Sequence, residues 1–165
     1  DRGYPFAADP SQQLARMGGD EVLQLIDGAE YLLTNEYENS LLEQKTGLTS
    51  DEVLDRVKVR VTTLGKNGVQ ITGRGFAPIR VPVAREIQVY DPTGVGDGFR
   101  AGFFAALSWG LGLERAAQVG ALLATLVLET VASNLLAVTT SGPLAECASV
   151  HKGAPARTLE QYVDE

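Results

Sequence analysis

Apolar runs of strand type alternate with segments of helical spacing along the first half of the chain. This alternation limits the chain to a layered α/β fold, because the apolar stripe of each helix must be covered by a sheet or by another helix. Strand-like runs are expected at residues 4–9, 31–35, 57–64, 69–72 and 76–83, and helices at 11–17, 20–26, 36–46 and 51–56. The run VKVRVTTL at 57–64 alternates and is rich in β-branched residues, as a strand would be.

Turn and cap residues indicate where several of these elements end. Gly47 stops the helical pattern at 36–46, and Thr49 followed by Glu52 has the spacing of a capping box for the next helix. Pro78 and Pro82 flank the last strand-like run, which favours a hairpin at an edge of the sheet, where proline is tolerated.

Two longer helical patterns occupy the second half of the chain, at residues 96–109 and 113–131. The second belongs to an apolar stretch over 119–137, but Glu129 and Asn134 make that stretch too polar for a membrane span. We expect a buried helix there and no membrane partner. Beyond residue 131 the periodicity is lost, apart from a candidate helix at 158–163.

Length and composition fit one globular domain. The chain has 165 residues, 44% of them hydrophobic and 21% charged. The net charge of -7 argues against a nucleic-acid partner, since nothing in the sequence forms a basic stripe.

The single cysteine, Cys147, cannot form an internal disulfide, and no charged-then-apolar leader opens the chain, so we expect a cytoplasmic protein. The first residues include no initiator methionine, which is typical of a piece of a longer protein.

The segment DPTGVGDGFRAGF, residues 91–103, carries the strongest chemical signal. Gly94 and Gly96 bracket Val95 where a helix is expected to begin, and glycines at a helix start let unpaired backbone amides approach an anion. Asp97 then lies beside an anion site. It would serve as a general base for a hydroxyl that attacks a phosphoryl group, or it would merely interact favourably with the helix dipole. The motif alone leaves both interpretations open.

Two further segments allow a functional and a structural interpretation. NEYE at 35–38 places Asn35 and Glu38 at a helix start, where they form either a capping box or a site for phosphate and hydrated magnesium. TLGKNG at 63–68 follows a strand and is either a nucleotide contact or an ordinary glycine turn.

In their order and spacing, the three segments resemble the ribokinase-like kinases of the PfkB carbohydrate kinase family. The family's second signature is D-x-x-G-A-G-D, and Val95 replaces the usual small middle residue. The form D-P-T-G-V-G-D-x-F-R-A-G-F looks most like the adenosine kinases of actinobacteria. The resemblance implies an α/β fold, the C-terminal part of a three-layer ribokinase-like large domain. It also implies that Asp97 is the catalytic base and that the amides of Gly94, Val95 and Gly96 form the anion hole.

The resemblance further implies the ligands ATP and magnesium, and potassium as an activating cation. The implied nucleotide contacts are Asn35, Thr63, Gly65 and Gly68, and Glu38 would hold magnesium through water. Asp91 and Thr93 are the implied cation ligands, although Asp91-Pro92 also suits a simple turn.

The expected function is transfer of the terminal phosphoryl group of ATP to a hydroxymethyl group of adenosine or a related sugar, with a small-molecule substrate as the partner. The resemblance covers residues 6–131, and residues 132–165 form an atypical tail. It matches only the C-terminal half of a family member, without the half that binds the acceptor. Two alternatives therefore stay open: an inactive nucleotide-binding fragment, and an assembly module whose unpaired sheet edge joins another chain, with a homodimer as one form.

Several other residues are expected to have structural roles. Phe99, Phe103 and Phe104 are interpreted as core, and Trp109 as packing near a helix end. Arg100 follows Asp97 by three positions and is expected to form a surface salt bridge, with contact to a phosphate as the alternative.

Overall fold

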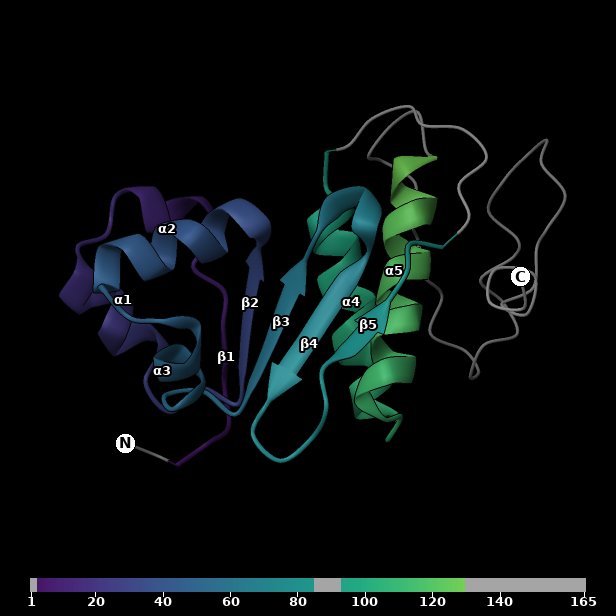
Figure 1. Ribbon diagram of the computed structural model, residues 1–165. Helices are drawn as coiled ribbons and strands as arrows, with labels where there is room; N and C mark the ends of the chain where they lie inside the picture. The colour runs from purple at the N-terminus through teal and green to yellow at the C-terminus, as the bar shows by residue number, and fades with distance from the viewer. Residues whose placement is uncertain (1–2, 85–92, 130–165) are drawn as a thin grey trace, which may run out of the picture. The chain divides into compact units, whose positions relative to one another are not determined.

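The computed structural model describes residues 3–84 and 93–129, in two compact units, Asp1–Val81 and Pro82–Glu165 (Figure 1). Asp91, the tail at 132–165 and the candidate helix at 158–163 therefore lie outside the described residues. So does the expected domain boundary at residue 131, which stays a prediction.

The first unit is built on a five-stranded mixed sheet in the order β1-β2-β3-β4-β5. Strands β1 (Ala7–Ala8), β2 (Tyr31–Asn35) and β3 (Val59–Thr63) are parallel. Strands β4 (Val69–Gly73) and β5 (Ile79–Val81) continue the sheet in antiparallel fashion, which confirms the expected hairpin at a sheet edge. The parallel strands need crossover connections, and helices supply them.

Local signals in the sequence set the helices of this unit. Helix α2 (Glu36–Thr46) begins at a capping box and ends at Gly47, which has the left-handed φ of 71° that a residue without a side chain adopts readily. Helix α3 (Ser50–Leu54) begins at the Thr49 capping box. Helix α1 (Gly19–Ile26) buries Val22 and Ile26.

An apolar core joins these helices to one face of strands β1 and β2. Figure 1 shows α1, α2 and α3 together beside these strands. Its buried members are Ala8, Leu14, Val22, Ile26, Ala29, Leu32, Leu42, Val53 and Val57. Helix α1 contributes two of these side chains, whereas α2 contributes only Leu42.

The alternation of β3 gives the sheet two chemically different faces. Val61 pairs with Leu33 on one side and Ile71 on the other, so these apolar side chains share a face. Arg60 pairs with Leu32, and its side chain therefore lies on the face that carries the core of the first unit.

In the second unit, helices α4 (Val95–Ser108) and α5 (Leu113–Leu128) pack closely against each other. A Cβ atom on Gly102 would lie 2.9 Å from both Gly120 Cα and Val119 O, so the two backbones are nearly in contact. Phe99 and Phe103 are buried and their rings stack with centroids 5.8 Å apart, as expected for core residues.

Three local expectations differ from the structure. The strand expected at 4–9 is only the two residues of β1, and Tyr4 and Phe6 are exposed. The segment after Pro10 forms a short 3-10 helix, η1 (Ser11–Ala15), rather than an α-helix. Trp109 is 53% exposed rather than packed, because it follows the last turn of α4. Among the described residues, no helix combines the length and the apolar character that crossing a membrane requires.

Candidate functional site

Two of the three motifs meet at the carboxyl ends of neighbouring strands. Asn35, the last residue of β2, is the register partner of Thr63, the last residue of β3. In open α/β sheets, ligands bind beyond the carboxyl ends of parallel strands. NEYE and TLGKNG therefore lie side by side where this architecture places a ligand.

The start of α2 is a complete capping box. The Glu38 amide donates to Asn35 Oδ1 at 2.8 Å, and the Asn35 amide donates to Glu38 Oε2 at 2.8 Å. The structural interpretation of NEYE is thus confirmed. The same bonds hold the Glu38 carboxylate, which is 7% exposed, in one place at the positive end of the helix.

The TLGKNG segment is a tight turn between β3 and β4. It contains the 3-10 helix η2 (Gly65–Asn67), and the Leu64 amide donates to Gly68 O at 2.8 Å. Gly65 and Gly68 have φ values of 55° and 83°. The turn carries the chain directly from Thr63 to Val69, which are register partners.

The start of α4 has the backbone conformation of an anion-binding nest. Gly94 is left-handed, with φ 79° and ψ -1°, and the right-handed helix begins at Val95. Such a change of hand turns successive amide groups toward one concavity. The Gly98 amide donates to Gly94 O at 2.8 Å within the helix. The amides of Val95, Gly96 and Asp97 precede this bond, in the positions that an α-helix leaves without an intrahelical partner.

An exposed carboxylate and a cation accompany this nest. The side chain of Asp97 is 89% exposed, and Arg100 Nη1 lies 4.0 Å from Asp97 Oδ1, as the expected salt bridge requires. A Cβ atom on Gly96 would lie 2.6 Å from Arg100 Nη1, so the guanidinium group reaches back over the first turn of α4. This turn thus combines hydrogen-bond donors for an anion with a group that can accept a proton.

The oxygen ligands present suit a magnesium ion that is also held by water and by substrate phosphates. Among the described residues, no three His, Cys, Asp or Glu side chains gather into a metal cage. Magnesium at nucleotide sites is typically held by one or two carboxylates, by water and by substrate phosphates, and Glu38 at a capped helix start fits that arrangement. Of the two implied cation ligands, Thr93 lies exposed in the turn before α4, and Asp91 is outside the described residues.

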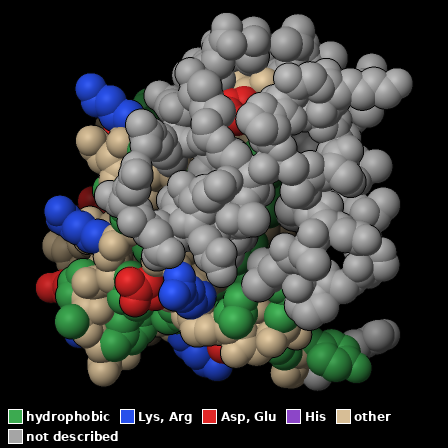
Figure 2. Space-filling model, turned by 90° about the vertical axis from the view of Figure 1, so that its right-hand side faces the viewer, with side chains coloured by type: hydrophobic (Ala, Val, Ile, Leu, Met, Phe, Trp, Pro, Cys, Tyr) green, Lys and Arg blue, Asp and Glu red, His purple; other side chains and the backbone are tan. Residues whose placement is uncertain are grey.

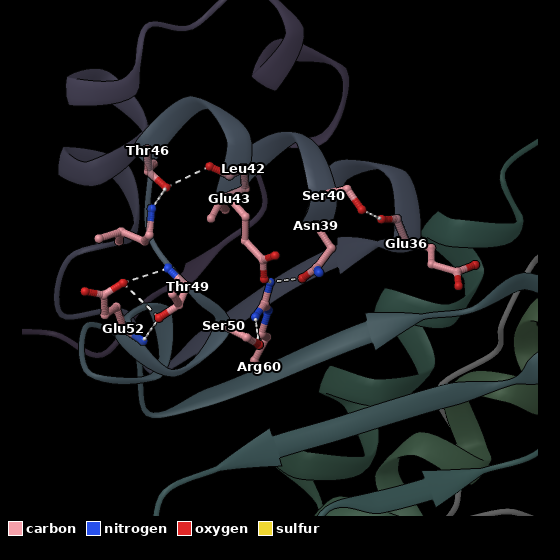
Figure 3. Close-up of polar contacts among 11 residues, drawn as sticks. Glu36, Asn39, Ser40, Leu42, Glu43, Thr46, Thr49, Ser50, Glu52 and Arg60 are labelled. Carbon is pink, nitrogen blue, oxygen red and sulfur yellow. Dashed lines mark hydrogen bonds and ion pairs between the residues drawn. The ribbon is translucent and has the colours of Figure 1, made fainter.

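Arg60 belongs to none of the three motifs, yet it is the most deeply buried charged residue in the described part of the chain, at 3% exposed. Its guanidinium group binds side chains of α2 and of Ser50, at the start of α3 (Figure 3). The alternation of VKVRVTTL assigns Arg60 to the polar face of its strand, but it does not reveal that helices cover that face.

Figure 2 shows how charged side chains are distributed on one face of the molecule, and the expected absence of a nucleic-acid partner stays a prediction. On the coloured part of the face in Figure 2, Lys and Arg side chains stand apart from one another among hydrophobic and acidic ones. No continuous basic area is present on that part of the face.

Comparison with known proteins gives consistent results. The model of the pfkB family carbohydrate kinases matches residues 6–139. The nucleoside kinase of Methanocaldococcus jannaschii is 32% identical over 121 residues, which are 73% of this chain and 40% of that protein. The chain thus spans about two fifths of the length of this relative.

Solved structures share the fold. The nucleoside kinase of Burkholderia thailandensis in complex with inosine has a TM-score of 0.74 and 34% identity, over 78% of this chain and 43% of that chain. The same enzyme has been solved with ADP-inosine. The adenosine kinase of Sinorhizobium meliloti has a TM-score of 0.67 and 26% identity, over 78% of this chain and 41% of that chain. The expected ribokinase-like fold is confirmed, whereas a special likeness to actinobacterial adenosine kinases stays a prediction.

Proposed function

This chain belongs to the pfkB family of carbohydrate kinases, and from that premise we propose that it is the C-terminal part of an ATP-dependent nucleoside kinase. The proposed reaction moves the terminal phosphoryl group of ATP to a hydroxymethyl group of the acceptor. The acceptor that we favour is adenosine, because relatives include nucleoside kinases and an adenosine kinase, and one of them binds inosine.

The observation that carries the proposal is the first turn of α4. Asp97 accepts the proton of the acceptor hydroxyl as that oxygen attacks phosphorus. The amides of Gly94, Val95 and Gly96 stabilise the charge on the transferred phosphoryl oxygens. The carboxylate and the amides belong to one turn whose backbone has the conformation of an anion nest. A carboxylate that only interacted with the helix dipole would need no nest beside it.

The first unit supplies the nucleotide contacts in this proposal. Asn35, Thr63, Gly65 and Gly68 contact ATP at the carboxyl ends of β2 and β3. Magnesium, when bound, neutralises phosphate charge, and Glu38 orients its water ligands. The same proposal includes potassium as an activating cation, with Asp91 and Thr93 as its ligands. It also includes a homodimer as the form of the protein.

A second candidate function is nucleotide binding without catalysis. The observation that favours it is the length of the match, since the chain covers 40% of the Methanocaldococcus jannaschii nucleoside kinase. The nest and the capped helix start would then bind ATP phosphates, while no acceptor reaches Asp97.

A binding titration followed by a product assay tests both candidates. The unfolding temperature of the chain is measured with increasing Mg·ATP, and ADP release is then measured with adenosine, inosine or ribose. A rise in unfolding temperature together with nucleoside-dependent ADP release supports the kinase. A rise without product supports the binding fragment. No rise at Mg·ATP concentrations of several millimolar would contradict both proposals.

A further inference from the structure

Arg60 is a cation enclosed between the sheet and two helices. It lies on β3 and is 3% exposed, and the close-up in Figure 3 shows its guanidinium group pointing toward α2 and the start of α3. Nη2 donates to Glu43 Oε1 at 2.9 Å and also to Asn39 Oδ1, both on α2. Nη1 donates to Ser50 Oγ at 2.8 Å. One side chain thus ties β3 to both helices.

Stability alone would not favour a buried guanidinium group at this position. Burial lowers the pKa of Arg60, and the neighbouring Glu43 carboxylate only partly opposes that effect. Among the described residues, Arg60 Nε has no hydrogen-bond partner, although it is buried. Apolar side chains of similar volume often replace a buried ion pair without loss of stability. The planar guanidinium group, through Nη1 and Nη2, fixes the geometry between the strand and the helices.

Helix α2 contributes two apolar side chains to the core of the first unit, Leu42, which is buried, and Leu41, which is partly buried. Of its eleven residues, only Glu38 and Leu42 are buried. The layer beneath its start also contains Thr34, whose hydroxyl group is buried and has no hydrogen-bond partner among the described residues. Thr34 precedes the cap residue Asn35 and shares a sheet face with Arg60. Directional contacts therefore help to fix the position of α2, and those from β3 come from Arg60, the most deeply buried charged residue in the described part of the chain.

Arg60 connects the two elements that present the candidate nucleotide contacts. Along β3 it precedes Thr63 by three residues, and on α2 its partner Asn39 directly follows Glu38. We propose that Arg60 is a positioning residue that holds the start of α2 in place against the end of β3, so that Glu38 and Thr63 meet the nucleotide together. This inference rests on the proposed function for its ligand, and on the contacts of Arg60 for its geometry.

The test separates positioning from stability by three variants. Arg60→Met removes the guanidinium group, and Arg60→Met with Glu43→Leu replaces the ion pair by apolar side chains. Arg56→Met is the matched control, because Arg56 forms an ion pair with Asp27 at 3.2 Å in a more exposed place. Within the described part of the chain its side chain makes no hydrogen bond to α2. For each variant, the urea midpoint and the dissociation constant for Mg·ATP are measured on the full chain.

We expect the double variant to regain the urea midpoint of the parent chain while its dissociation constant for Mg·ATP rises by about 3- to 30-fold. The Arg56→Met variant should bind Mg·ATP as the parent does. A double variant with parental stability and parental affinity would overturn the inference and leave the proposed function intact.

If the parent chain itself binds no Mg·ATP, that result contradicts the proposed function and does not test the role of Arg60. An additional measurement tests that role without nucleotide. Hydrogen exchange at the Asn35 and Glu38 amides, which make the capping box, should be about tenfold faster in the double variant than in the parent. Exchange in α5 should be unchanged. Equal exchange at the two cap amides would overturn the positioning role regardless of nucleotide binding.

Discussion

Gly102→Ala tests the close contact on which the packing of α4 depends. The added methyl group would lie 2.9 Å from Gly120 Cα and from Val119 O, and both are backbone atoms of α5. No side-chain rotation can relieve this overlap, so the two helices must separate. Because α4 begins with the candidate phosphoryl-transfer turn, the variant also tests the support of that turn.

The magnitude follows from two opposing effects. Replacing glycine by alanine inside a helix stabilises that helix by about 1 kcal/mol. An ordinary contact between carbon atoms is about 3.5–4.0 Å long, and a separation of about 0.5–1 Å loses roughly a quarter to a half of each contact energy across the interface. Overpacking of this kind typically costs about 1–3 kcal/mol. Because the added methyl group meets two backbone atoms at once, we expect a cost in the upper part of that range, roughly 2–3 kcal/mol, and therefore a net loss of roughly 1–2 kcal/mol in the free energy of unfolding.

Urea unfolding measures this loss as a lower midpoint at an unchanged slope, by roughly 0.5–1 M. Gly112→Ala is the matched control, because Gly112 precedes α5 with nothing within 4 Å of an added Cβ atom. Gly112 is the N-cap of α5, where alanine caps less well than glycine but also lowers the entropy of the unfolded chain. These effects oppose each other, so that control should stay within about 0.5 kcal/mol of the parent. A Gly102→Ala variant as stable as the parent, or more stable, would refute the close approach of α4 and α5.

The remaining predictions concern the helix caps of the first unit. The Thr49 amide and hydroxyl lower the pKa of Glu52 below its usual 4.5, so the stabilisation is complete above that value and is lost as the pH falls through the lower pKa of the folded state. Lowering the pH from about 6 to about 3 should reduce the free energy of unfolding, measured in urea, less for Glu52→Gln than for the parent chain. An equal reduction in both proteins would contradict this role of the cap. Asn35→Ala should cost about 1 kcal/mol in urea unfolding and weaken Mg·ATP binding in calorimetry, and unchanged values of both would rule out either role. Gly47→Ala should cost about 1 kcal/mol, because φ there is 71°; no loss would mean that α2 ends differently.

Local chemistry made parts of the fold predictable from the sequence. The bounds of α2 follow from Asn35 and Gly47, since a cap and a left-handed terminator act through bonds within a few residues. The nest is predictable in the same way, because Gly94 and Gly96 are glycines at an expected helix start.

Features that depend on distant segments were not predictable. The alternation of β3 assigns Arg60 to a polar face, but only the packing of α2 and α3 determines that this face is covered. The contact between Gly102 and Gly120 likewise requires knowing which faces of α4 and α5 meet. The candidate site contains both kinds of feature: its motifs are local, while the support of the Glu38 position by Arg60 is not.

The most direct test of the central claim is the turnover of Asp97→Asn, with Asp20→Asn as the control. Asp20 is an exposed aspartate in the first turn of α1, so its variant reproduces the loss of a favourable dipole interaction without touching the nest. Nucleoside-dependent ADP release is measured in the chain, or in a longer protein that contains it, beside the affinity for Mg·ATP. If Asp97 is the base, Asp97→Asn lowers turnover by about 10²-fold or more while Mg·ATP still binds, and Asp20→Asn has near-normal turnover. Near-normal turnover of Asp97→Asn would contradict the account.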